Sequence, residues 1–228
     1  MRSPAARIGI LGDIHAEDEL LDLALRHLAR EDLDAILAVG DIVDGKGSVD
    51  ACCDALREAG ALVVRGNHER WLLRDDMRHL PDSTSLRGIA PRTRDFLEAL
   101  PTTLRIPTVL GELLLCHGTG DDDMCAVRPD DFGYALEVNE ALQTLLRDGR
   151  TALVVCGHSH QRMVRRFGPL TIVNAGTLYR GHQPCFGTID LRAGGTREVT
   201  FFERGGDERD EVAIAGVFPL PGVIRTGD

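Results

Sequence analysis

LVVCGHSHQ, residues 153–161, is the stretch that decides what kind of fold to expect. Its apolar run is typical of a strand buried in a sheet, yet the run ends in Gly157-His158-Ser159-His160. Two imidazoles on a tight turn fit poorly into an apolar core. An apolar run that ends in polar side chains occurs four more times in the chain, which indicates a common cause.

Apolar runs and helical periods alternate along the chain. Five runs are predicted to be strands, at residues 7–13, 35–41, 62–67, 112–118 and 153–158. Three stretches carry apolar residues at helical spacing, at residues 18–32, 48–60 and 132–149. Ser48 is a suitable N-cap and Gly60 a suitable C-terminal stop for the second helix. The alternation predicts βαβ units and a largely parallel sheet.

The pattern changes after His160. Residues 163–177, 185–191 and 198–204 are short strand-like pieces joined by glycine and proline, which predicts antiparallel hairpins. We find no internal repeat and no clean domain boundary, so residues 1–204 are predicted to form a single domain. Residues 205–228 lack a clear period and are predicted to be a C-terminal tail or a loosely packed extension.

Composition limits the class of protein. A chain of 228 residues, 43% of them hydrophobic, can bury a sizeable core. The net charge of −10 argues against a nonspecific nucleic-acid binder, which would carry a basic face; only small fragments or ends remain as nucleic-acid substrates. No apolar run fits a secretory signal or a membrane span. The six cysteines form no CxxC pair, which favours free thiols in a reducing cytoplasm over disulfides or a zinc knuckle.

Polar side chains follow all five predicted strands. They are Asp13, His15, Asp41, Asp44, Asn67, His68, His117, His158 and His160. Because ligands of open α/β sheets bind at the carboxyl ends of the strands, we expect these side chains in one cleft. Leaving so many polar groups buried and unpaired is costly, whereas a metal cluster turns carboxylates and neutral imidazoles into satisfied ligands. Glycines adjoin the ligands where a Cβ would block close backbone approach: Gly12, Gly40, Gly66, Gly118 and Gly157.

The ordered motifs D-x-H, G-D, G-N-H-E, H-G and G-H-x-H, spread over roughly residues 7–190, resemble the calcineurin-like metallophosphoesterase superfamily. The resemblance is to its small prokaryotic phosphodiesterase-like branch. It implies a two-sheet β sandwich flanked by helices, in four layers α/β/β/α. It also implies a dinuclear metal site. The first ion would be held by Asp13, His15, Asp41 and His160, and the second by Asn67, His117, His158 and the bridging Asp41.

These nitrogen and oxygen donors suit two divalent transition-metal ions better than they suit Ca or Mg. We expect Mn first, with Fe, Zn, Ni or Co as the alternatives. The resemblance implies that a hydroxide held between the ions attacks a phosphoester. His68 is the candidate general acid, and Asp44 is expected to hydrogen-bond it and favour its protonated form. The alternative for His68 is a structural histidine that caps the turn. Glu69 is expected to be a solvated loop charge or to make a structural hydrogen bond.

Several other polar residues lie outside these motifs. Arg180 and His182 follow Asn174-Ala175-Gly176-Thr177, where the family has an N-P-G-S-like turn, and they either face the substrate or lie in a plain hairpin loop. The acidic stretch 121–131 is expected to be a solvated loop; if it lines the cleft, it would disfavour polyanions. We expect His27 and His79 at the surface, and Trp71 to be a packing residue.

One departure from the family narrows the substrate. Its phosphoprotein phosphatases carry GDxVDRG, whereas this chain reads GDIVDGKG, with Gly45 in place of the arginine and Lys46 offering only a point charge. We therefore expect a cytoplasmic metal-dependent phosphoesterase that hydrolyses phosphodiesters of small nucleotide-like molecules and has no membrane partner. The alternatives are a phosphomonoesterase, a protein Ser/Thr phosphatase-like activity, or a non-catalytic scaffold of this fold. Scaffolds lack a ligand or the catalytic histidine, and this chain retains all of them.

Overall fold

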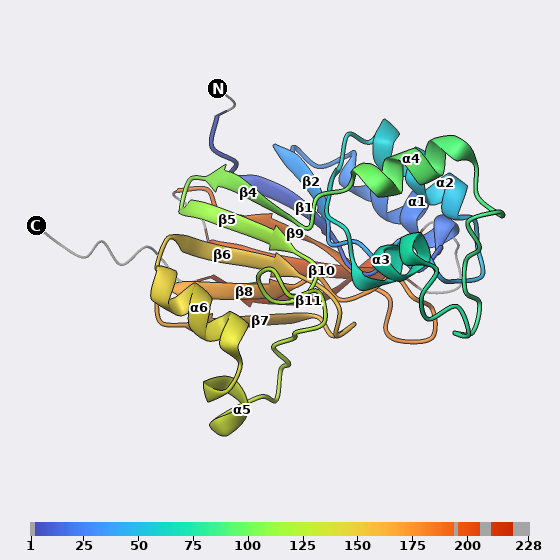
Figure 1. Cartoon of the computed structure of the whole chain (residues 1–228). Coiled ribbons are helices and arrows are strands. Elements are labelled where there is room, and N and C mark those ends of the chain that lie inside the picture. Colours follow the sequence, from blue (N-terminus) through green and yellow to red (C-terminus); the bar gives the residue numbers. More distant parts are fainter. Residues whose placement is uncertain (1–2, 194–195, 206–210, 221–228) are drawn as a thin grey trace, which may run out of the picture.

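Two β sheets stack face to face in the computed structural model, which describes residues 3–193, 196–205 and 211–220 (Figure 1). The strands are β1 (Arg7–Leu11), β2 (Ala35–Ala38), β3 (Leu62–Val63), β4 (Thr103–Thr108), β5 (Gly111–Cys116), β6 (Thr151–Cys156), β7 (Met163–Phe167), β8 (Leu170–Asn174), β9 (Phe186–Asp190), β10 (Glu198–Arg204) and β11 (Val212–Pro219). The helices are α1 (Asp18–Leu28), α2 (Val49–Glu58), α3 (Asn67–Arg74), α4 (Pro91–Ala99), α5 (Tyr134–Glu137) and α6 (Glu140–Asp148).

Each sheet contains three neighbouring parallel strands, which lie at one edge of the six-stranded sheet and in the centre of the five-stranded sheet. The six-stranded sheet has the order β11-β10-β9-β1-β2-β3, and the five-stranded sheet has the order β4-β5-β6-β8-β7. Strands β1, β2 and β3 run parallel, as do β5, β6 and β8, whereas the remaining neighbours are antiparallel. The expected parallel units and later hairpins are therefore both present, but in two mixed sheets and not in one largely parallel sheet.

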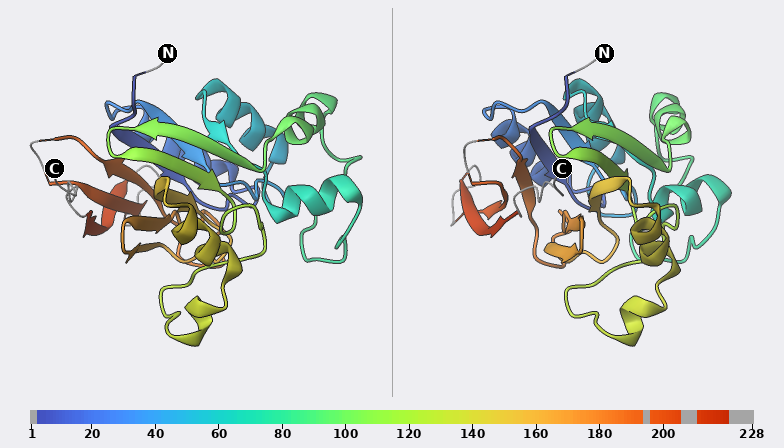
Figure 2. Two further views of the ribbon diagram at one scale, coloured as in Figure 1. Left: turned by 60° about the vertical axis from the view of Figure 1, so that its left-hand side comes forward. Right: turned by 90° about the vertical axis from the view of Figure 1, so that its left-hand side faces the viewer.

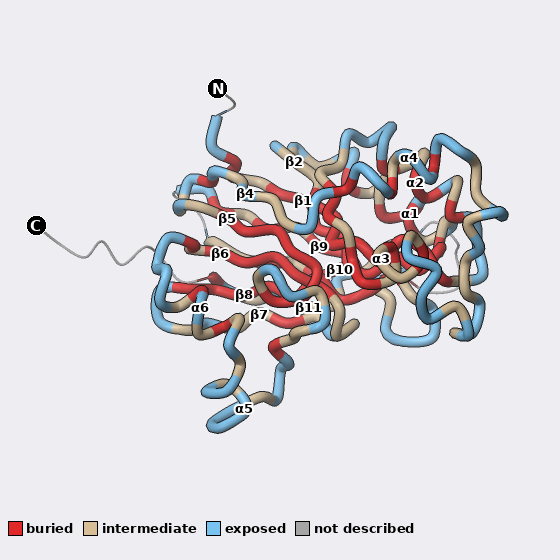
Figure 3. The backbone as a smooth tube through the Cα atoms, viewed as in Figure 1, coloured by how far each residue is buried: buried red, intermediate tan, exposed pale blue. Residues whose placement is uncertain are grey.

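Three apolar cores separate the four layers. Because successive strand residues face opposite sides, Leu113 and Leu115 of β5 pack between the sheets, while Leu114 faces α6. A further core joins α1 and α2 to the outer face of the six-stranded sheet through residues such as Leu21 and Leu56. Figure 3 shows this buried interior running through both sheets. The α/β/β/α sandwich implied by the sequence motifs is confirmed.

The predicted helices form, with one difference. The Ser48 side chain caps α2 by accepting a hydrogen bond from the Ala51 N–H, and Gly60 follows its end at φ +62°. The single helix predicted over residues 132–149 is interrupted, because the Asn139 side chain accepts from the Leu142 N–H and starts α6 afresh. The preceding turn, α5, projects from the body of the molecule (Figure 2).

The described part of the predicted C-terminal tail is ordered β structure. Strand β11 pairs with β10 from Glu198–Pro219 to Arg204–Val212, so it extends the six-stranded sheet at its edge. This corrects the expectation of loose packing for residues 212–219; the stretch from Val212 to Pro219 contains no polar residue, so no alternation of apolar and polar residues marks it as a strand. Residues 206–210 and 221–228 of that tail lie outside the described residues. In the described part of the chain, every helix is too short or too polar to cross a bilayer.

Candidate metal centre

The candidate metal centre lies where the carboxyl ends of the two parallel strand sets meet. Loops after β1, β2 and β3 bring Asp13, Asp41 and Asn67, while those after β5 and β6 bring imidazoles. Apart from His15, the six-stranded sheet thus supplies oxygen donors and the five-stranded sheet supplies nitrogen donors. The structure brings together all of the predicted ligands: Asp13, His15, Asp41, Asn67, His117, His158 and His160.

The backbone at this centre is turned sharply. Five of the predicted site residues adopt left-handed φ values of 46° to 65°, namely His15, Asp41, Asp44, His158 and His160. Such conformations each cost on the order of 1 kcal/mol or more and persist where the surroundings impose them. Backbone hydrogen bonds impose them here, for example from the His15 N–H to the Asp41 carbonyl at 2.7 Å. The consequence is that the strand ends bend and direct their side chains toward one place.

The glycine beside the ligand Asn67 is required for steric reasons. A Cβ placed on Gly66 would lie 2.2 Å from Asp41 Oδ1, so any side chain there would displace the carboxylate. The contact confirms the prediction that close backbone approach excludes a side chain at this position.

One group of donors consists of His15, Asp41 and His160, whose ligand atoms all lie within 4.8 Å of one another. The His15 Nε2 atom is 3.1 Å from His160 Nε2 and 3.9 Å from Asp41 Oδ2. His15 Nδ1 lies 3.2 Å and 3.1 Å from the carbonyls of Val43 and Asp44, so it is the nitrogen that donates. The lone pair of His15 Nε2 therefore faces the other donors.

The second group consists of Asp41, His117 and His158. His117 Nε2 is 3.3 Å from Asp41 Oδ2 and 2.8 Å from Asn67 Oδ1, and His158 Nδ1 is 3.0 Å from the same amide oxygen. His117 Nδ1 donates to the Val39 carbonyl at 2.8 Å, which again leaves Nε2 to face oxygen atoms. Asp41 belongs to both groups, as the bridging position requires.

These donors fit a divalent cation. Among the described residues Asp13 Oδ2 has no hydrogen-bond partner although it is buried, and in the first group the lone pair of His15 Nε2 faces His160 Nε2. Uncompensated, such an arrangement costs several kcal/mol per buried polar group, whereas cations between the donors satisfy all of them. Asp13 also accepts from the His158 N–H at 3.1 Å through its other oxygen, which fixes the orientation of the carboxylate.

Burial keeps three imidazoles in the neutral form that binds metals. It lowers the pKa of His15 and of His158, and it lowers the pKa of His160 to about 3, with help from the neighbouring His15 and His182. His117 differs: burial alone would lower its pKa, but the adjacent Asp41 raises it to about 10. A cation at this position would take over the charge that the proton balances.

His68 and Asp44 form the predicted pair. His68 Nδ1 donates to Asp44 Oδ2 at 2.7 Å, and His68 Nε2 lies 3.9 Å from Asp41 Oδ2, on the side of the metal ligands. Burial alone would lower the pKa of His68, but the hydrogen bond to Asp44 and the charge of Asp41 raise it. The rings of His15 and Trp71 pack against His68 at 4.8 Å each, so Trp71 is the packing residue that was predicted.

Two residues that the sequence did not indicate hold Asp44 in place. Arg78 donates to both carboxylate oxygens, at 2.9 Å and 3.1 Å, and the Thr84 N–H donates at 2.7 Å. Both come from the connection between α3 and α4, and no motif in it signals this role. The three contacts fix the carboxylate that orients His68.

Glu69 takes the second of its two predicted roles. It is fully buried and accepts four backbone N–H groups, those of Gly66, Asp41, Ile42 and Val43. These hydrogen bonds tie the start of α3 to the loop after β2. Glu69 therefore holds the two ligand loops together and is not a solvated charge.

Arg180 and His182 have different surroundings. The Arg180 guanidinium pairs with the buried carboxylate of Glu17, with Nη2 at 2.5 Å, so it anchors its loop and is turned to Glu17 and not to the cleft. His182 is exposed, and its Nδ1 lies 2.7 Å from Nδ1 of His160. Both histidines line a pocket of about 520 Å³ on this side of the centre. His182 therefore contacts the predicted metal ligand His160 and is connected to the site by that contact.

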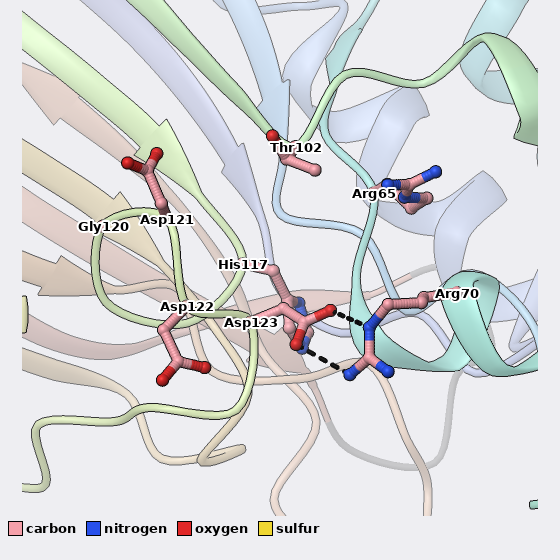
Figure 4. A pocket seen from close by; sticks show the side chains of 8 residues that line it. All are labelled: Arg65, Arg70, Thr102, His117, Gly120, Asp121, Asp122 and Asp123. Carbon is pink, nitrogen blue, oxygen red and sulfur yellow. Dashed lines mark hydrogen bonds and ion pairs between the residues drawn. The ribbon is translucent and has the colours of Figure 1, made fainter.

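The acidic loop after β5 is part of the site's surroundings. Asp123 accepts from Arg70 Nε and Nη2 at 2.6 Å and 2.8 Å, which fastens the loop to α3. Asp121, Asp122 and Asp123 line a pocket of about 480 Å³ whose wall includes His117 (Figure 4). Asp121, Asp122 and Asp130 are exposed charges, as the sequence led us to expect, whereas Asp123 and Asp131 are half-buried.

The two remaining histidines differ from each other. His79 is exposed, as predicted. His27 is half-buried and packs its ring against Phe186 and Phe202, at 5.4 Å and 4.6 Å, so the surface position predicted for it is wrong. Its ring fills the gap between α1 and the strands β9 and β10.

Comparisons with known proteins concern the family of the chain and its fold. The family model described as the calcineurin-like phosphoesterase superfamily domain matches residues 6–194. A hypothetical protein from Pyrococcus horikoshii OT3 is similar in structure, with a TM-score of 0.70, 14% identity, and 86% and 87% of the two chains covered. A metallophosphoesterase from Sphaerobacter thermophilus has a TM-score of 0.57, 20% identity, and 94% and 88% coverage.

A structure described as a novel archaeal phosphodiesterase has a TM-score of 0.51, 15% identity, and 94% and 99% coverage. At these identities the solved structures show a shared fold. No curated protein matches the chain in sequence.

Proposed function

The chain belongs to the calcineurin-like phosphoesterase superfamily, and on this premise we propose that it is a metal-dependent phosphodiesterase for small nucleotide-like substrates. The observation that carries the proposal is Asp41, whose carboxylate belongs to both groups of donors. A shared carboxylate between two sets of imidazoles supports a dinuclear centre. When bound, a pair of divalent ions supplies an activated water and neutralises charge on the phosphoryl oxygens.

The chain's own contribution is to hold the donors and to move a proton. His15 and His117 each fix one ring nitrogen on backbone carbonyls, so the other nitrogen stays available as a ligand. His68 donates Nδ1–H to Asp44, which leaves Nε2 facing the cluster. In its protonated form His68 gives the Nε2 proton to the leaving alkoxide, and Asp44 stabilises the imidazolium from which that proton comes.

Steric and spatial features favour a diester over a phosphoprotein. A Cβ on Gly45 would lie 1.8 Å from the His15 carbonyl oxygen, so the backbone has no room for the arginine that the phosphoprotein phosphatases carry there. Pockets of about 480 Å³ and 520 Å³ flank the centre, one reaching His117 and the other His160. Two flanking pockets suit a phosphodiester, because each pocket can take one of its two ester groups.

The alternatives make different predictions. A phosphomonoesterase would need only one flanking pocket, and it stays the second candidate because nothing in the donor set distinguishes the two reactions. A non-catalytic scaffold is disfavoured, since every predicted ligand and His68 lie together at the site. All six cysteines are free thiols, which is in keeping with the cytoplasmic location that we propose.

The test is metal depletion followed by reconstitution. Metal-depleted protein should not hydrolyse bis-p-nitrophenyl phosphate, added Mn²⁺ should restore turnover, and p-nitrophenyl phosphate should be the poorer substrate. Turnover that survives chelation would contradict the proposal, and a preference for the monoester would favour the second candidate. Asp41→Asn should bind fewer than two ions per chain by elemental analysis; two bound ions would contradict the bridging role.

A further inference from the structure

The pocket beside His117 has an uneven distribution of charge. Its charged lining residues are Arg65, Arg70, Asp121, Asp122 and Asp123. Figure 4 shows the aspartates on the loop after β5 and the arginines on the opposite side, with Arg65 in the segment before α3 and Arg70 on α3. The two walls of the pocket therefore carry opposite kinds of charge.

One pair of these charges cancels. Arg70 and Asp123 form a bidentate ion pair, with both side chains about three-quarters buried. The pair removes one cation and one anion from the surface that a ligand meets, and it holds the loop against α3. Asp121 and Asp122 stay exposed beside it.

The remaining lining charges are one cation and two anions. Within the described residues, the side chain of Arg65 makes no hydrogen bond or ion pair, and it lies across the pocket from the loop that carries Asp121 and Asp122. Asp121 likewise has no polar partner there, and Asp122 only accepts from the Met124 N–H at 2.9 Å. A ligand with a second anionic group that reaches the loop would meet two uncompensated carboxylates.

We propose that Asp121 and Asp122 form a charge-selective wall, which limits the substrate to diesters whose only anionic group is the scissile phosphate. The inference rests on the proposed phosphodiesterase function and adds a substrate class to it. A nucleotide diester that carries a further terminal phosphate is disfavoured because that phosphate is repelled at the wall, and not because the metal centre rejects it.

The chain contains a matched control for this wall. Asp130 and Asp131 lie further along the same loop and do not line the pocket. Asp130 has no polar partner among the described residues, and Asp131 accepts the Arg128 N–H at 2.8 Å, as Asp122 accepts that of Met124. The double variants D121N/D122N and D130N/D131N therefore change net charge equally and retain the same kind of local hydrogen bond.

The substrates are thymidine 5′-(p-nitrophenyl phosphate) with and without a 3′-phosphate. For the wild-type holoenzyme, kcat/KM should be roughly tenfold lower with the 3′-phosphate at low salt. D121N/D122N should remove most of that difference, whereas D130N/D131N should leave it intact. Salt at ~0.5 M should reduce the difference, because exposed charges are then screened.

Equal effects of both double variants would show a general net-charge effect and overturn the wall, as would equal kcat/KM values for the two substrates in the wild type. A second readout does not depend on turnover. Calorimetry should show that the wild type binds thymidine 3′,5′-bisphosphate more weakly than thymidine 5′-phosphate, and that only D121N/D122N reverses this. Absence of hydrolysis of every substrate would refute the proposed function, while the calorimetric result would still decide the wall.

Discussion

The two flanks of the candidate metal centre are built differently. On the α3 flank, His68 is held by a buried carboxylate that itself has three further hydrogen bonds from Arg78 and Thr84. On the opposite flank, His160 is hydrogen-bonded to the exposed ring of His182, and its ring lies 6.2 Å from that of Tyr179. The first flank is fixed by a network of polar groups, and the second is open to solvent and borders a pocket.

This difference shows where the protein needs rigidity. A group that gives a proton to a leaving oxygen must be held at hydrogen-bond distance in one orientation. A ligand that shares its metal with several other donors tolerates a weaker support, since the other donors also position the ion. The following experiments test that contrast.

The largest loss of activity is expected for His68→Ala. The variant should lower kcat by roughly 10²–10⁴, the usual size of a general-acid contribution. Metal content should stay at the wild-type value, because His68 is not among the donors. Elemental analysis beside steady-state kinetics measures both, and His79→Ala, at an exposed position, is the control. Near-normal turnover would make His68 a structural histidine.

The second-largest loss of activity is expected for Asp44→Asn. Its kcat/KM should be lower by about 10–100-fold, because the substitution weakens the hydrogen bond that orients His68. Asp44 raises the pKa of His68, and a general acid works only when protonated, so the wild type keeps activity up to a higher pH. In the variant the alkaline limb of the pH–rate profile should move to lower pH. Adding Asp44→Asn to His68→Ala should cause little further loss; independent, additive losses would separate the two residues.

His182→Ala tests the open flank. Because an exposed residue gives His160 only one hydrogen bond, we expect metal affinity to fall by about tenfold or less. Turnover at saturating metal should be close to that of the wild type. Titration of the metal-depleted protein with Mn²⁺ measures the affinity. A loss as large as that of Asp44→Asn would mean that the two flanks do not differ in the way described.

The smallest effect is expected for Arg180→Ala. Arg180 pairs with Glu17 and is turned away from the pocket, so kcat/KM should stay within about threefold of the wild-type value. The residue supports its loop, and the melting temperature should fall because the buried carboxylate of Glu17 loses its charged partner. A rise in KM of tenfold or more, with an unchanged melting temperature, would place Arg180 on the substrate.

Several features followed from local sequence. The strands before Asp13, Asp41 and His117 are apolar runs of strand length, and a polar residue follows each run directly or after one glycine, so both strand and ligand could be predicted. The same holds for the cap of α2 at Ser48, which depends on neighbouring residues alone.

Other features depend on contacts between distant segments. Arg78 reaches Asp44 across 34 residues of sequence, and Arg180 reaches Glu17 across 163. Neither partner carries a pattern that identifies the other. The bound position of Asp123 on Arg70 has the same origin, which is why the acidic loop was expected to be solvated throughout.

For this protein, then, the sequence by itself determined which side chains end the buried strands, because strand length, apolar alternation and polar termination are local properties of the chain. Only the tertiary structure decided how those side chains are supported and which charges face the pockets. The stacking of two sheets places loops that are far apart in sequence next to each other, and hydrogen bonds and ion pairs form between whichever groups that stacking brings within reach.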